Sequence, residues 1–145
     1  MSSVEMDQEV LESVEPCIED NGTYWFTYEN LNVRELARAM NAVQARFVTI
    51  TAYELAKNEG FRLEYHWDLA GRLLGFTFHL AGNSIESIYD LCEAVDWIER
   101  EVHEGFGIVF TGREYEPLLL RKNDAPGVNM REFTGPDRMV QEAGK

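Results

Sequence analysis

The stretch FRLEYHWDLAGRLLGFTFHL, which spans residues 61–80, decides the fold because its two halves carry matching patterns. In the first half apolar and polar residues alternate strictly, and in the second half apolar residues stand at every other position from Leu74 to Leu80. Such alternation is typical of β-strands with one buried face. Between the halves stands the pair Ala70-Gly71, which fits a two-residue hairpin turn. The stretch therefore predicts an antiparallel β-hairpin.

The turn sets a register in which the two strands can be compared. Pairing across Ala70-Gly71 brings the apolar residues to one face as Trp67 with Leu74, Tyr65 with Phe76, Leu63 with Phe78 and Phe61 with Leu80. On the polar face it places Arg62 opposite His79 and Glu64 opposite Thr77. A slip of one residue would move every apolar side chain to the wrong face. The sequence therefore predicts this register alone.

Two further strands are indicated upstream of the hairpin. Residues 47–55 supply Val48, Ile50 and Ala52 at alternating positions, and they predict a third strand beside the hairpin. Residues 23–28 are dense in aromatic and β-branched side chains, which favour a strand. The hairpin and the strand at 47–55 are expected to form a small antiparallel sheet.

Two helices are predicted from helical spacing and end signals. Residues 32–44 form the first, because Asn32 can cap it with Glu35 three residues on, and its apolar face carries Leu36, Met40 and Val43. The second is predicted to begin at Asn83 or Ser84 and to end at Gly105 or Gly107. Its apolar stripe comprises Ile88, Leu91, Cys92, Val95, Ile98 and Val102.

The fold class that follows is α+β, a small antiparallel sheet packed with two main helices and followed by an extended C-terminal tail. We expect three regions: an acidic N-terminal arm at 1–22, a core domain at 23–112, and a partner-binding tail at 113–145. The arm holds seven acidic and no basic side chains, unlike a secretory signal, so we expect no leader there. Prolines interrupt the tail at Pro117, Pro126 and Pro136, so neither a helix nor a central strand can run far through it.

Composition excludes several classes of function. The 145 residues carry 26 acidic and 13 basic side chains, a formal net charge of -13, which would repel the phosphates of nucleic acids. The two cysteines, Cys17 and Cys92, stand far apart and cannot hold a cysteine-ligated cluster by themselves. No phosphate-binding glycine loop and no nucleophile elbow occurs in the sequence. We therefore expect no nucleic-acid partner, no cofactor and a cytoplasmic compartment.

Two groups of residues could in principle bind a metal. Asp96, Glu99 and His103 recur at helical spacing, and Glu64, His66, Asp68 and His79 share the polar face of the predicted hairpin. Acids at such helical spacing usually face water, and Arg62 beside His79 would oppose a cation. A small metal-dependent enzyme that uses these clusters nonetheless stays open as one alternative function, and a free-standing acidic interaction module as another.

The run VDWIEREVHEGFGIVFTG, residues 95–112, resembles the signature of the thirty-kilodalton (C) subunit of NADH:quinone oxidoreductase, respiratory complex I. It is also similar to the related subunits of membrane-bound energy-converting nickel-iron hydrogenases. The resemblance is strongest over residues 94–121 and looser over 46–80. Two positions depart from the family pattern, since Gly105 replaces a hydrophobic residue and Arg113 replaces a His or Lys. The run from Leu118 to Gly127 looks like the shorter hydrogenase subunits rather than the complex I branch.

The resemblance implies a scaffold subunit without a cofactor or an active site of its own, within an oxidoreductase complex. It implies docking on the large subunit, which houses the nickel-iron centre or the quinone site, next to iron-sulfur subunits. The chain would then be peripheral on the cytoplasmic face of the inner membrane, held there by its partners. A hydrogenase subunit is the preferred interpretation, and the C subunit of complex I is the alternative.

The signature residues are expected to form the interface with these partners. The set is Trp97, Glu99, Arg100, Glu101, Glu104, Phe106, Gly107, Ile108, Phe110, Arg113, Pro117 and Arg121. Charged residues of this set are expected to pair across the interface, while Phe106, Ile108 and Phe110 anchor the turn. Arg100 is the one base among the acids of the helix. If it holds two carboxylates together, its removal should leave buried acids unpaired and weaken assembly.

Overall fold

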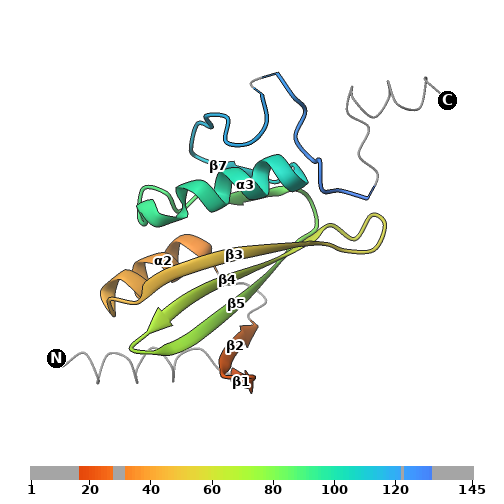
Figure 1. Cartoon of the computed structure of the whole chain (residues 1–145). Helices are drawn as coiled ribbons and strands as arrows, with labels where there is room; N and C mark the ends of the chain where they lie inside the picture. The colour runs from red at the N-terminus through yellow and green to blue at the C-terminus, as the bar shows by residue number, and fades with distance from the viewer. Residues whose placement is uncertain (1–16, 28–31, 122, 132–145) are drawn as a thin grey trace.

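The computed structural model describes residues 17–27, 32–121 and 123–131. Its main feature is a five-stranded sheet with the strand order β1-β2-β5-β4-β3 (Figure 1). The strands are β1 (Cys17–Asp20), β2 (Thr23–Thr27), β3 (Arg46–Glu54), β4 (Phe61–Leu69) and β5 (Arg72–Leu80). A second, two-stranded sheet joins β6 (Ser84–Glu86) to β7 (Val109–Thr111) in parallel. With its two helices the described part has the predicted α+β class.

The hairpin of β4 and β5 has the predicted register at every position. Phe61 pairs with Leu80, Tyr65 with Phe76, Trp67 with Leu74, and Arg62 lies opposite His79. Ala70 and Gly71 both have positive φ angles, 50° and 87°, as a two-residue turn of this hand requires. The Gly71 N–H also donates to the Asp68 carboxylate at 2.9 Å. The apolar face of the hairpin is buried as expected, with Leu63, Tyr65 and Leu74 fully inaccessible.

Strand β3 contains an irregularity that the sequence analysis missed. Val48 was expected on the buried face with Ile50 and Ala52, but a β-bulge shifts the register between Phe47 and Thr49. Because a bulge inserts one residue into one strand, the alternation changes phase at that point. Phe47 therefore packs edge-on against Trp67 with ring centroids 5.5 Å apart, and Val48 is 41% exposed.

The sheet is mixed, because β2 pairs with β5 in the parallel direction, Phe26 beside Phe76. The three strands that the sequence placed in an antiparallel sheet are antiparallel, and β2 extends them along the open edge of β5. Beyond β2 lies β1, in four residues that were assigned to the acidic arm. Residues 1–16 of that arm, and the tail beyond Arg131, lie outside the described residues.

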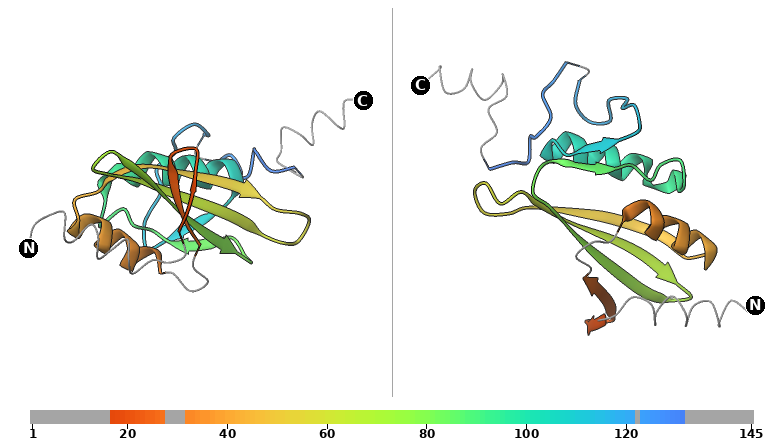
Figure 2. Two further views of the ribbon diagram at one scale, coloured as in Figure 1. Left: turned by 90° about the horizontal axis from the view of Figure 1, so that it is seen from below. Right: turned by 180° about the vertical axis from the view of Figure 1, so that it is seen from behind.

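Both helices lie on one side of the hairpin and β3, as the views of Figures 1 and 2 agree. Helix α2 (Val33–Ala42) begins as predicted, since the Asn32 side chain accepts from the N–H groups of Arg34 and Glu35. Its buried residues Leu36 and Met40 join the core of the sheet. Helix α3 (Asp96–Phe106) contacts the same core through Phe106, whose ring lies 6.3 Å from that of Phe61. No helix among the described residues is long and apolar enough to span a membrane.

The second helix is shorter than predicted. It begins at Asp96 after a single 3₁₀ turn (Glu93–Val95), and not at Asn83 or Ser84. Ser84–Glu86 is instead a strand, because β7 lies beside it and supplies backbone partners. The apolar spacing is explained by packing, since Ile88 and Val95 are fully buried without being in one helix. The predicted end is confirmed: Gly107 terminates α3 in the left-handed conformation at φ 68°.

The turn of the hairpin offers a direct test of its strain. A left-handed backbone is costly for alanine and is tolerated by asparagine, so Ala70→Asn is expected to stabilise the fold by about 1 kcal/mol. Urea unfolding would measure the change, with Gly82→Ala as the control, because a Cβ at Gly82 meets open space. A loss of stability in Ala70→Asn would contradict this account of the turn.

Candidate functional site

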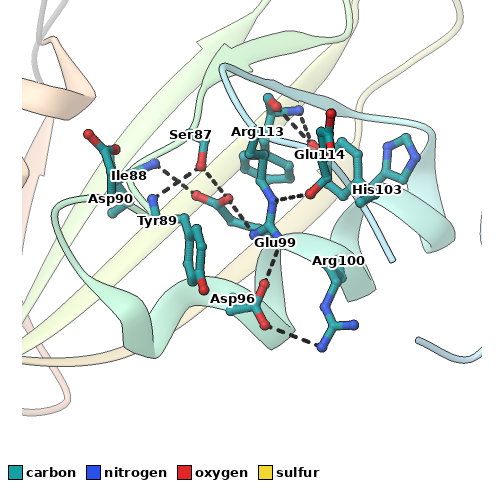
Figure 3. Close-up of polar contacts among 12 residues, drawn as sticks. Ser87, Ile88, Tyr89, Asp90, Asp96, Glu99, Arg100, His103, Arg113 and Glu114 are labelled. Carbon is teal, nitrogen blue, oxygen red and sulfur yellow. Dashed lines mark hydrogen bonds and ion pairs between the residues drawn. The ribbon is translucent and has the colours of Figure 1, made fainter. Parts of the chain in front are cut away.

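A buried carboxylate organises the N-terminal half of α3. Glu99 is 0% exposed, and its two oxygens accept from the Ser87 hydroxyl at 2.7 Å and from the Ile88 N–H at 3.0 Å. Arg113 adds an ion pair at 3.2 Å to the oxygen that Ser87 binds. Figure 3 shows these donors converging on Glu99 from the loop before α3 and from the segment after β7. One side chain thus joins three separate segments.

Arg113 is the cation of this network. Its guanidinium binds Asp96 as well as Glu99, and its side chain is only 7% exposed. The rings of Tyr89 and Tyr115 lie 4.7 and 5.1 Å from the guanidinium carbon, so aromatic faces flank the charge. Among the described residues Arg100 binds one carboxylate, and it is Arg113 that lies between two. Arg100 pairs with Asp96 at 3.3 Å and donates to the Glu116 carbonyl.

The protonation of the site follows from its burial. Burial raises the pKa of Glu99, and the bonds from Ser87, Ile88 and Arg113 act in the opposite direction. Burial also raises the pKa of Tyr115 to about 12, so its phenol keeps its proton at physiological pH. The Tyr115 hydroxyl donates to the Phe110 carbonyl at 3.0 Å and accepts from the Phe110 N–H. These groups hold neighbouring segments together.

A second carboxylate on α3 fastens the start of the tail. Glu104 is 8% exposed and accepts from the N–H groups of Leu118 and Leu119 at 2.8 Å and of Leu120 at 3.3 Å. Burial acts to raise the pKa of Glu104, but these donors outweigh it and the pKa lies below its ordinary value. The tail then crosses the end of α3, where the Asn129 N–H donates to the Gly105 carbonyl at 2.7 Å.

Gly105 permits this close crossing. A Cβ at Gly105 would lie 2.7 Å from the nitrogen of the Asn129 side-chain amide, so a larger residue there would require that side chain to move. Between the tail and α3 remains a cavity of about 290 Å³, lined by Arg100, His103 and Leu120 among others. Farther on, the Arg131 N–H donates to the Glu54 carboxylate at 2.8 Å. The described tail thus lies against its own domain.

The predicted interface residues fall into three groups by exposure. Fully or nearly buried are Glu99, Glu104, Ile108 and Phe110, and partly buried are Arg100, Phe106, Gly107 and Arg113. Exposed are Trp97, Glu101, Pro117 and Arg121, with Trp97 at 70%. Ser87, Tyr89 and Tyr115 belong to the same network but were missed, because no local pattern relates them to α3.

Neither candidate metal cluster is assembled. Among the described residues no three His, Cys, Asp or Glu side chains are placed to hold a metal ion. Asp96 and Glu99 are directed at Arg113, and His103 donates from Nδ1 to the Ile108 carbonyl at 2.8 Å. On the sheet, Glu64 pairs with Arg62 at 3.4 Å and Asp68 pairs with Arg46. These acids and His103 therefore have other partners.

Comparison with known proteins gives one family and a shared fold. The family described as respiratory-chain NADH dehydrogenase, 30 Kd subunit, matches residues 26–135. A trypsin-resistant fragment (1–134) of Nqo5 is similar in structure with a TM-score of 0.63 and 21% identity, over 77% of this chain and 99% of the fragment. A chain of the membrane-bound sulfane sulfur reductase, an archaeal respiratory membrane complex, has a TM-score of 0.64 and 21% identity, over 77% and 71%. The search of curated proteins found no match.

Removal of the buried cation tests the network around Glu99. Arg113→Ala is expected to cost about 3 to 5 kcal/mol of unfolding free energy, because it leaves a buried carboxylate without its counter-charge. The loss should shrink as the pH falls, since a protonated Glu99, whose pKa is already raised, needs no cation. Chemical unfolding at several pH values measures both effects.

The matched control is Arg46→Ala, whose side chain is 73% exposed in its pair with Asp68. An exposed pair contributes at most about 1 kcal/mol. Equal losses in the two variants would show that the Glu99 pair is no stronger than a surface pair.

Glu104→Gln tests how the tail is held. Because the pKa of Glu104 is lowered in the folded state, its stabilising effect exists above the usual Glu pKa of about 4.3 and is lost as the pH falls through the folded value. We expect the amides of Leu118, Leu119 and Leu120 to lose hydrogen-exchange protection in Glu104→Gln at neutral pH. In the wild type the same amides should lose it on acidification. The exposed Glu114→Gln serves as control, and unchanged protection in Glu104→Gln would contradict the assignment.

Proposed function

Because this chain belongs to the respiratory-chain NADH dehydrogenase 30 Kd subunit family, we propose that it is a non-catalytic structural subunit of a membrane-associated electron-transfer complex. The observation that carries the proposal is the family match, which extends over residues 26–135 and includes the sheet strands β3–β5, both helices and the tail as far as residue 135. The subunit would dock on the large subunit of that complex, near its iron-sulfur subunits.

The chemistry of the site supports a scaffold role. Two carboxylates of the signature that could have served as acids or bases are bonded to other parts of the same chain. Glu99 accepts hydrogen bonds from Ser87 and Ile88 and pairs with Arg113. Glu104 accepts hydrogen bonds from backbone N–H groups of the tail. A general acid or base needs access to a substrate proton. Groups that are buried and bonded in this way are suited to holding a shape.

Within the family we propose the branch of energy-converting nickel-iron hydrogenases. The support is the run from Leu118 to Gly127, which resembles the shorter hydrogenase subunits. The similarity in fold to a chain of an archaeal respiratory membrane complex is compatible with this branch. The C subunit of NADH:quinone oxidoreductase is the second candidate, and the similarity to Nqo5 favours it. In either case the chain would lie on the cytoplasmic face of the membrane, attached through its partners.

Different regions of the chain would contact the partner subunits. We assign docking to the core domain at 23–112 and to the tail at 113–145, with the acidic arm at 1–22 as a further partner contact. In the described part of the tail Leu119 is 77% exposed, although its backbone is fixed to Glu104. An exposed apolar side chain on an anchored backbone offers a partner a contact whose position is already fixed, which lowers the entropy lost on binding.

Purification from native membranes tests the proposal. A tag on the acidic arm should recover the chain from gently solubilised membranes together with a nickel-iron large subunit and iron-sulfur chains, all identified by mass spectrometry. Recovery of NADH-oxidising chains instead would move the assignment to complex I. Recovery of the chain alone, from the soluble fraction, would contradict a role as a subunit and favour a free-standing interaction module.

A further inference from the structure

The side chain of Trp97 is unusually exposed for a residue of its size. It projects from the first turn of α3 and is 70% exposed, whereas Trp25 on β2 is partly buried and Trp67 on β4 is 1% exposed. Tryptophan is highly buried on average in folded chains, and exposed tryptophans are enriched where proteins bind one another. The side chain is not needed for the core, because the buried residues of α3 are Glu99, Val102, Glu104 and Gly105.

Two exposed acids flank Trp97. Glu101 stands four residues later on the same helix face, and Glu93 stands four residues earlier in the 3₁₀ turn. Both are exposed, and no ion pair found among residues 17–27, 32–121 and 123–131 uses either carboxylate. The nearby cations are already engaged, since Arg100 and Arg113 both bind Asp96. As far as the described residues form it, the surface around the indole therefore carries negative charge that no cation offsets.

The helix that presents this surface is rigidly held. Glu99, two residues after Trp97, is bonded to the loop before α3 and to the segment after β7. Arg113 ties Asp96, the residue before Trp97, to the same network. The indole is thus presented on a helix turn whose position is set before any partner arrives, which lowers the entropy lost on binding.

We propose that Trp97, Glu93 and Glu101 form a docking surface for a partner protein that presents an apolar socket rimmed with Lys or Arg. The indole would fill the socket, and the two carboxylates would pair with the basic rim. The proposal rests on the proposed function as a subunit, and it adds which surface docks and what chemistry the partner must have.

Charge decides between the partners that an exposed tryptophan could meet. A second copy of this chain, docked through the same surface about a two-fold axis, would bring the acidic residues of one copy against those of the other. Nucleic acid and anionic lipid would be repelled by the same carboxylates and by the net charge of -13. A basic protein surface is attracted both by these two carboxylates and by the negative net charge of the chain.

Carbodiimide cross-linking tests the proposal, because it joins a carboxylate to a lysine amine only when the two are in contact. The complex recovered from native membranes through the tagged chain would be treated in this way, and the linked peptides identified by mass spectrometry. We expect amide links from Glu93 or Glu101 to lysines of one other chain of the complex. Links from these two residues to lysines of a second, isotope-labelled copy would overturn the proposal in favour of self-association.

Variants supply the second arm of the test. Trp97→Ala is expected to lower recovery of the linked partner at least about tenfold, with an unchanged melting temperature because the side chain is exposed. Val48→Ala on β3, which truncates another apolar side chain at 41% exposure, is the matched control and should recover the partner normally. The double variant Glu93→Gln, Glu101→Gln should recover less partner, and this recovery should depend less on salt. The double variant Glu35→Gln, Glu59→Gln removes two other exposed acids and should change neither the recovery nor its salt dependence.

The outcomes separate this inference from the proposed function. If the wild type recovers its partners while Trp97→Ala recovers them equally and no links form at Glu93 or Glu101, the docking surface is wrong and the subunit role stands. If the wild type recovers no partner, both the subunit role and the docking surface are wrong.

Discussion

The ion pair between Glu99 and Arg113 is the interaction on which the arrangement of β6, α3 and β7 depends. Three segments meet at it: the loop that follows β6, helix α3, and the stretch after β7 (Figure 3). None of the three has enough apolar surface to form a separate core, and the short parallel pair of β6 and β7 would be marginal alone. A carboxylate with no solvent exposure needs every donor it has. The pair thereby commits all three segments to one arrangement.

The two acids of α3, Glu99 and Glu104, show how environment assigns different tasks to the same side chain. Glu99 meets a hydroxyl, a backbone N–H and a guanidinium, and burial raises its pKa. Glu104, one turn and a half later, meets the backbone N–H groups of the tail, which outweigh burial and lower its pKa. Glu99 bonds α3 to the loop after β6 and to the segment after β7. Glu104 bonds the start of the tail to the end of α3. What remains exposed on α3, Trp97 with its acidic neighbours, is then free for a partner.

Much of the fold could be predicted because its strongest signal is local. The hairpin alternates from Phe61 to Leu69 and from Leu74 to Leu80, and its turn leaves one register in which both apolar faces agree, so the predicted pairing is confirmed. The cap at Asn32 and the terminating Gly107 are likewise set by neighbours within one turn of helix. The errors arose where distant segments compete. The helix expected from Ser84 yields to a strand because β7 offers backbone partners from more than 20 residues away, and Val48 leaves the core because a bulge changes the phase of β3.

By itself, the sequence determined the α+β class, the hairpin register and the resemblance to a family of respiratory-complex subunits, since each depends on residues close together in the chain. It did not determine which arginine neutralises Glu99. Arg100 is the neighbour on the helix, but its side chain lies toward Asp96 and the tail, and Arg113 reaches Glu99 only because β7 returns beside β6. Tertiary structure decided which charges became buried bonds and which stayed exposed. The physical reason is that the free energy of a buried charge depends on partners brought by folding, and spacing along the chain does not specify them.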